Sequence, residues 1–125
     1  MHIIGKINPK IYNCITTDII SDNVIITDNQ IQHIKERHPN DYEQYSILLP
    51  EIIQNPQYII EASKPYTALI LRSFPSNNLF FKTVLRLATI HDNPNYNNSI
   101  ITFMKIDEKE FSRLIKNKKI LYKID

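Results

Sequence analysis

The sequence predicts an α+β domain in which an antiparallel sheet lies between helical segments along the chain. Two helix starts are marked by side chains suited to cap a first turn, and a run of strand-like segments lies between them. Short polar turns separate the later strands, and connections this short favour antiparallel pairing. Helices first, then strands, then a helix is typical of the α+β class.

The first marked helix begins at Thr27. This residue fits the N-cap position, and Gln30 stands three residues on as its capping-box partner. The helix should end near His38, because Pro39 disfavours helical geometry in the residue before it. Residues 24–26 form a short apolar strand or an extended lead-in to the helix.

The segments on either side of this helix are less sharply marked. Residues 3–20 carry mixed β-type signals. A second helical stretch is expected over residues 41–54, divided at Pro50, because proline opens a new turn. Four strands are expected at residues 58–62, 67–74, 79–90 and 99–106.

The last helix begins at Asp107, which fits the N-cap position. Glu110 stands at the capping-box position, and apolar residues recur on one face of the segment. Residues 120–122 are expected to form a closing strand.

The composition excludes several classes of protein. The chain of 125 residues has one glycine and one cysteine. Glycine-rich phosphate loops, internal disulfide frameworks and cysteine-rich zinc sites are therefore excluded. No apolar run is long enough to span a membrane and the N-terminus lacks a signal peptide, so we expect one soluble, cytoplasmic domain over residues 1–125 with no membrane partner.

The formal net charge of +2 hides an asymmetry along the chain. Residues 1–62 hold four Lys or Arg against eight Asp or Glu, and residues 63–125 hold eleven against five. The basic half could face a polyanion, although a solvated basic surface is the commoner case.

The segment with the most chemistry is the first marked helix. At 100° per residue, His33 and Arg37 stack one turn apart at the rim of the apolar stripe, where we expect them to be half covered. Histidine moves protons near neutral pH, and arginine suits a phosphate or its transition state. The pair therefore suits metal-free phosphodiester cleavage in which a ribose 2′-OH attacks its own phosphate. From the residues alone, a core or capping role for His38 and a surface role for His33 is the commoner arrangement.

A metal centre is the weaker interpretation of this helix. His33 and His38 are five residues apart, which is not the i, i+4 spacing that points two imidazoles at one ion. No cysteine or carboxylate cluster supports them, so no metal and no cofactor is expected.

Three residues of the predicted strands could join such a site. Strict alternation puts Thr102 on the face of Ile100, Met104 and Ile106, where a hydroxyl needs a partner or a bordering cavity. Lys82 and Arg86 share one face of the long predicted strand. Either could contact phosphate, and either could simply be solvated.

Several segments in order resemble the phage-type nucleases of the barnase/EndoU/colicin/RelE-like (BECR) group. They are VIITDNQIQHIKERHP at 24–39, NDYEQY at 40–45, EIIQNPQYIIE at 51–61, LRL at 85–87, NNSIITF at 97–103 and NKKILYK at 117–123. The resemblance covers most of the chain. It implies N-terminal helices packed on a four-stranded antiparallel sheet, and a metal-independent ribonuclease of phages, prophages and mobile elements.

The resemblance also implies an active site. By position, the proposed catalytic residues of the group fall on His33, Arg37, His38 and Thr102. The first hypothesis is therefore an endoribonuclease that leaves a 2′,3′-cyclic phosphate. In it, His33 acts as general base or acid, Arg37 stabilises the phosphorane, and His38 is either the second proton carrier or the end of the helix.

The same hypothesis assigns the RNA backbone to basic side chains of the second half. They are Lys82, Arg86, Lys109, Arg113 and Lys116. The partners expected are RNA and an inhibitor or phage protein. The second hypothesis is a toxin-like module that binds RNA, the ribosome or a protein without catalysis.

Overall fold

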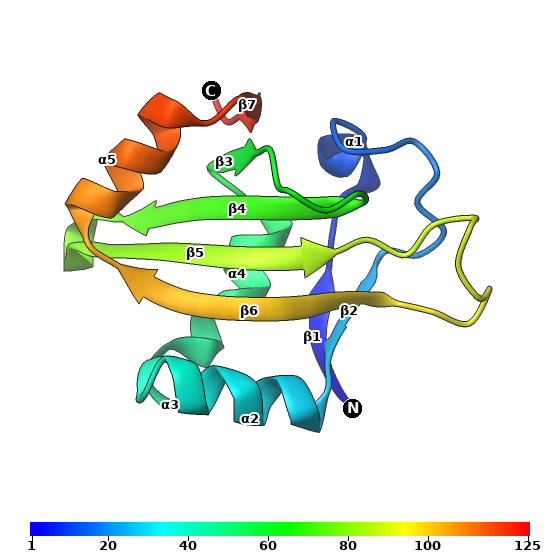
Figure 1. The fold of residues 1–125 in the computed structure, drawn as a ribbon, viewed down its shortest axis with the longest axis horizontal. Helices are drawn as coiled ribbons and strands as arrows, with labels where there is room; N and C mark the ends of the chain where they lie inside the picture. The colour runs from blue at the N-terminus through cyan, green and yellow to red at the C-terminus, as the bar shows by residue number, and fades with distance from the viewer.

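The computed structural model describes residues 1–125 and is built around a seven-stranded sheet (Figure 1). The strands are β1 (His2–Lys6), β2 (Asn23–Ile26), β3 (Tyr58–Ile60), β4 (Thr67–Phe74), β5 (Leu79–Arg86), β6 (Asn98–Ile106) and β7 (Ile120–Lys123). Their order across the sheet is β1-β2-β6-β5-β4-β3-β7. All neighbours pair antiparallel except β2 and β6, which run parallel.

The sheet is therefore larger than the four-stranded antiparallel sheet that was predicted. The four predicted strands are present as β3 to β6, but β1 and β2 extend one edge and β7 extends the other. The parallel β2–β6 pair makes the sheet mixed. It arises because β2 joins the sheet beside β6, a strand that lies more than 70 residues later in the chain.

The helices match the predicted pattern with small differences. They are α1 (Pro9–Tyr12), α2 (Asp28–Arg37), α3 (Asp41–Tyr45), α4 (Leu49–Gln54) and α5 (Glu108–Asn117), with short 3-10 turns at Ser46–Leu48 and Pro75–Asn77. The division at Pro50 is confirmed, because a new helix, α4, begins at Leu49 and carries Pro50 in its first turn. The segment expected to be mixed β structure holds the short helix α1 after β1.

Both predicted N-caps are present. The Thr27 hydroxyl accepts a hydrogen bond from the Gln30 N–H at 3.1 Å, and the Asp107 carboxylate accepts one from the Glu110 N–H at 2.7 Å. The capping box at α5 is not closed, because the Glu110 carboxylate bonds Arg113 instead.

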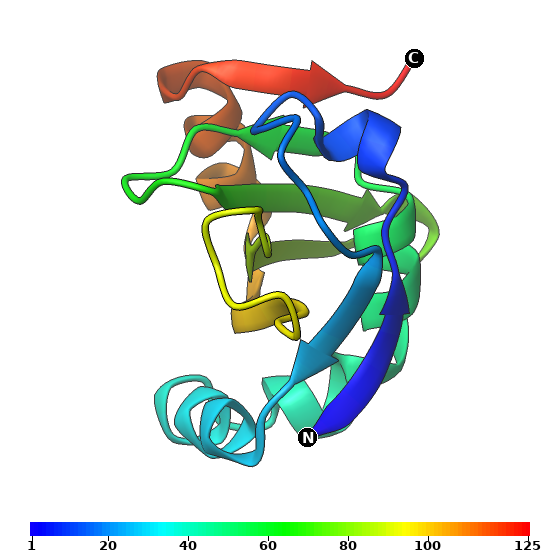
Figure 2. The same cartoon turned by 90° about the vertical axis from the view of Figure 1, so that its right-hand side faces the viewer.

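The two faces of the sheet are covered differently. The main hydrophobic core lies between the sheet and α4, with contributions from α1 and α2. A smaller core lies on the other face, where Phe111 and Leu114 of α5 pack on Ile60 and Leu71. Figures 1 and 2 show α5 and α4 on opposite sides of β4, β5 and β6, and α2 running alongside β6, where its buried Ile34 joins the main core. We call the α5 side the open face, because α5 covers only one end of it.

One buried side chain joins the segments around the parallel strand pair. Asn98, at the start of β6, is fully buried. Its amide nitrogen donates to the carbonyls of Ser21 and Asn23 at 2.7 and 3.0 Å, and its amide oxygen accepts from the Ala88 N–H at 2.8 Å. Three backbone groups receive a hydrogen-bond partner in this way, and β2 is fixed against β6.

Replacing Asn98 with alanine should destabilise the protein strongly, because three backbone groups, among them the buried Ala88 N–H, would lose their partner. We expect Asn98→Ala to lower the free energy of unfolding by about 3 kcal/mol, measured by urea denaturation. Asn97→Ala is the matched control, since the Asn97 side chain makes one contact of 3.4 Å with Ser21 and should cost less than about 1 kcal/mol. Equal losses for the two variants would contradict this role of Asn98.

Candidate active site

The helix α2 presents His33 and Arg37 to solvent. Both side chains are exposed and neither makes a hydrogen bond or ion pair within the protein. The expectation that they are half covered is wrong. The reason is that Ile34 alone of this helix is fully buried in the main core, so the stripe that anchors α2 is narrow.

The contacts of α2 define the direction in which this pair projects. On one side of the helix, Asp28 contacts His2 of β1 at 2.5 Å, and the Lys35 ammonium lies 6.0 Å from the ring centroid of Tyr42 in α3. At 100° per residue, His33 and Arg37 project roughly 160° away from Lys35. They therefore face away from β1 and α3, on a helix that borders the open face (Figure 2).

His38 ends the helix. Its backbone N–H donates to the Ile34 carbonyl at 2.7 Å, and its own carbonyl accepts from the Asp41 N–H at 3.2 Å. The residue is half-buried at the turn into α3, where Asn40 adopts a left-handed conformation. Its backbone thus fixes the junction between α2 and α3.

Thr102 lies on the open face because β6 contains a bulge. Ile100 pairs with Leu85 and Thr102 pairs with Val84, so Ile101 has no partner across the strands. Strict alternation predicted that Thr102 shares the face of Ile100, and that expectation is wrong. Ile100 faces the main core, and the extra residue turns Thr102 to the opposite side.

A pocket of about 740 Å³ occupies the open face beside Thr102. Its floor comes from β4, β5 and β6, and its walls come from the loop after β3 and the end of α5. The residues that line it are Glu61, Ala62, Ser63, Lys64, Pro65, Thr67, Leu69, Lys82, Val84, Arg86, Ile101, Thr102, Leu114 and Lys118. A volume of this size is in the range of ordinary ligand sites.

The pocket is basic. Lys64, Lys82 and Lys118 line it and make no ion pair, whereas its one carboxylate, on Glu61, accepts a hydrogen bond from the Lys119 N–H. The sequence analysis singled out Lys82 and missed Lys64 and Lys118. Lys64 lies in a loop and Lys118 follows the helix α5. No strand or helix periodicity predicts the direction of a side chain at either position.

The predicted basic stripe of α5 lies outside the pocket. Lys109, Arg113 and Lys116 are exposed, and none of them lines it. Arg113 donates two hydrogen bonds to Glu110, at 2.6 and 2.8 Å. This pairing holds the pKa of the Glu110 carboxyl below its usual range.

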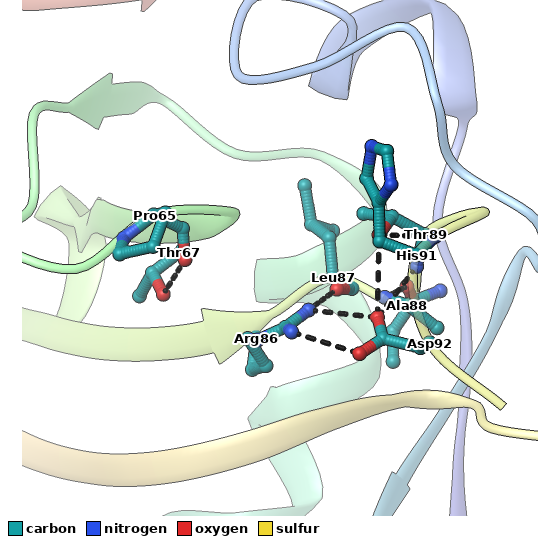
Figure 3. A network of polar contacts seen from close by, with 9 residues as sticks. Pro65, Thr67, Arg86, Leu87, Ala88, Thr89, His91 and Asp92 are labelled. Carbon is teal, nitrogen blue, oxygen red and sulfur yellow. Dashed lines mark hydrogen bonds and ion pairs between the residues drawn. The ribbon is translucent and has the colours of Figure 1, made fainter.

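Arg86 is the cation of the pocket with the most contacts (Figure 3). Its guanidinium makes two hydrogen bonds to Asp92, at 3.0 and 3.2 Å, and a third to the Leu87 carbonyl. The guanidinium carbon also lies 5.5 Å from the ring centroid of Tyr66. No sequence pattern indicates this network, because Asp92 lies in the polar turn after β5.

The network continues to His91, a histidine outside the predicted site residues. The ring of His91 stacks on Tyr66 at 5.8 Å, and its Nε2 lies 3.6 Å from the Asp18 carboxylate. Tyr66 has a φ of 55°, a left-handed conformation that is unusual for an aromatic residue. His91 itself does not line the pocket.

Nowhere do three or more His, Cys, Asp or Glu side chains gather closely enough to hold a metal ion. A bilayer-spanning helix is absent, since each helix falls short in length and apolar character.

The predicted site residues thus fall into two groups. Thr102, Lys82 and Arg86 line the pocket, and His33 and Arg37 are exposed on α2, a helix that borders the open face. This combination of a mixed sheet, a flanking helix and a basic pocket defines an α+β protein suited to an anionic ligand.

The comparison with protein families identifies the class. Residues 1–123 match the family described as phage-Barnase-EndoU-ColicinE5/D-RelE like nuclease 2, and the chain belongs to this family. The resemblance found in the sequence is therefore confirmed. The searches of curated proteins and of solved structures gave no match.

Because of the Arg86–Asp92 pair, the free energy of unfolding should depend on pH in the acidic range. Hydrogen bonds from the Thr89 N–H and from Arg86 hold the pKa of the Asp92 carboxyl below its usual range. A lowered pKa stabilises the fold above the pKa of the unfolded chain, about 3.9, and this stabilisation is lost as the pH falls through the folded value. Urea denaturation at successive pH values should show stability falling below about pH 4, and less steeply in Asp92→Asn.

Asp22→Asn, which removes a carboxylate without side-chain partners, should keep the wild-type slope. Equal slopes in Asp92→Asn and the wild type would contradict the pairing.

Proposed function

We propose that this nuclease cleaves RNA without a metal ion, by attack of a ribose 2′-OH on the adjacent phosphate. The observation that carries the proposal is the pocket on the open face. Three unpaired lysines, Arg86 and the Thr102 hydroxyl line it, and α2 with His33 and Arg37 borders the same face. Cations at this density attract a phosphate backbone, and a histidine supplies proton transfer near neutral pH.

In the proposed reaction, the 2′ oxygen forms a bond to phosphorus and the bond from phosphorus to the 5′ oxygen breaks. One proton leaves the 2′-OH and another is delivered to the 5′ oxygen, so the products are a 2′,3′-cyclic phosphate and a free 5′-OH. His33 takes or gives one of these protons, and His38 is the candidate for the other. Arg37 stabilises the charge on the pentavalent phosphorus, and Thr102 donates to a phosphate oxygen.

The acidic and basic halves of the chain meet in this arrangement. His33 and Arg37 come from the acidic first half, and Lys82, Arg86 and Lys118 come from the basic second half. RNA lying across the open face would contact both. The proposal needs the RNA backbone to run from the pocket toward α2.

The mechanism predicts cleavage that survives EDTA. Purified protein incubated with total RNA and with tRNA in EDTA should give fragments ending in a 2′,3′-cyclic phosphate. An RNA methylated at every 2′ oxygen should stay intact, because the attacking group is blocked. Cleavage that requires an added divalent cation, or cleavage of the methylated RNA, would contradict the mechanism.

Substitutions on α2 should separate chemistry from binding. We expect His33→Ala and Arg37→Ala each to slow cleavage about 100-fold or more, and Thr102→Val about tenfold. Lys35→Ala is the matched control, since it removes a cation from the opposite side of the same helix and should change the rate less than about twofold. The measurement is single-turnover cleavage with the enzyme in excess. Unchanged rates for His33→Ala and Arg37→Ala would exclude this site.

One observation favours a second function, RNA binding without cleavage. No histidine lines the pocket, so the cations could hold RNA with no group for proton transfer beside it. Under this alternative, the double variant His33→Ala/Arg37→Ala would match the wild type both in RNA affinity and in the effect of its expression on cells. Under the nuclease proposal, the double variant loses the cellular effect.

A further inference from the structure

We propose that Arg86 is the bidentate phosphate ligand of the pocket, and that Asp92 is the residue that positions it. The inference rests on the proposed function in one respect, namely that the ligand is RNA. It assigns a role to Asp92, an acid that would otherwise count only as the partner that neutralises a cation.

The hydrogen bonds of the guanidinium leave one edge free. Arginine carries five N–H donors in a fixed planar arrangement. Nη1 donates to the Leu87 carbonyl and to Asp92 Oδ2, and Nη2 donates once, to Asp92 Oδ1. Nε and the second hydrogen of Nη2 have no acceptor in the protein. These two donors lie side by side, in the geometry that binds two oxygens of one phosphate.

The Arg86 side chain is accessible from the pocket. The Arg86 side chain is 36% exposed and lines the pocket, whereas the Asp92 side chain is 14% exposed. Lys82, four residues before Arg86 in β5, and Lys64 line the same pocket, and neither makes an ion pair. A phosphate at the free edge would therefore lie among further positive charges.

Asp92 is itself held in place. Its Oδ2 accepts from the Thr89 N–H at 2.9 Å and from the Thr89 hydroxyl at 3.3 Å, in addition to its bonds with Arg86 (Figure 3). Thr89 is fully buried, so this acid links the guanidinium to a fixed part of the backbone. The ring of Tyr66 limits the guanidinium further. An arginine fixed in this way loses little freedom when it binds phosphate.

The sign of one substitution distinguishes positioning from neutralisation. If Asp92 only cancels the charge of Arg86, its removal should tighten the binding of an anion. If Asp92 orients the free Nε and Nη2 donors of Arg86, its removal should weaken binding, even though the protein becomes more positive. Asp92→Asn keeps an oxygen that can accept from Thr89, so it disturbs the loop as little as possible.

The test is fluorescence anisotropy of the full chain with a short, labelled, 2′-O-methyl oligoribonucleotide, which can bind without being cleaved. We expect Arg86→Ala to weaken binding about 10-fold or more and to reduce the salt dependence by about 0.7 in the slope of log K against log salt. Arg86→Lys should bind nearly as weakly as Arg86→Ala, because lysine lacks the two-donor edge. Asp92→Asn should weaken binding about 3- to 10-fold, with no further loss in the Arg86→Ala background.

The matched control is an arginine held by a carboxylate outside this pocket. Arg72 donates to Glu51 at 3.0 Å and lies outside this pocket, so Arg72→Ala and Glu51→Gln should leave oligonucleotide affinity within about twofold of the wild type. Melting curves of each variant confirm that the protein measured is folded. Unchanged binding in Arg86→Ala, or tighter binding in Asp92→Asn, would overturn the proposal.

This binding assay, run beside the cleavage assay on the same variants, separates this inference from the nuclease proposal. A protein that binds the oligonucleotide through Arg86 and Asp92 but cleaves no RNA would refute the proposed catalysis and support the subsite. A protein that cleaves RNA equally well with Arg86→Ala would support the catalysis and refute the subsite.

Discussion

The arrangement of the open face depends on the buried amide of Asn98. This side chain joins the start of β6 to residues 21 and 23 and to the backbone of Ala88, and so fixes the parallel β2–β6 pair. The helix α2 begins two residues after β2 ends, so its position follows from that pairing. A polar contact outside the pocket lining thereby helps to place α2, with His33 and Arg37, beside strands built by the second half of the chain.

The open face has a floor of paired strands, and most of the cations that line its pocket make no ion pair. The β6 bulge turns Thr102 toward the pocket, and the cover of α5 stops short, so cations from β5, the loop after β3 and the end of α5 remain accessible. Without glycine-rich loops, an anion bound here must be held by side chains. The Arg86–Asp92–Thr89 network shows how one such side chain is fixed in the absence of a backbone cradle.

Elements with strong local signals were predicted well. The caps at Thr27 and Asp107 set the starts of α2 and α5, and Pro50 set the start of α4, because each acts on its own neighbours. The sheet was predicted too small. Strands β1 and β2 carry weak periodic signals and are stabilised by partners distant in sequence. The direction of Thr102 was missed for a similar reason, since a bulge is a property of the strand pair rather than of one strand.

The sequence alone determined the α+β class, the family and the residue types available for chemistry, because these follow from local capping, composition and ordered motifs. Only the tertiary structure decided which cations share a pocket. It excluded the α5 stripe, added Lys64 and Lys118, and paired Arg86 with Asp92. The physical reason is that side-chain direction in loops and at helix ends, and the pairing of charges across turns, depend on packing between distant segments, which no local pattern specifies.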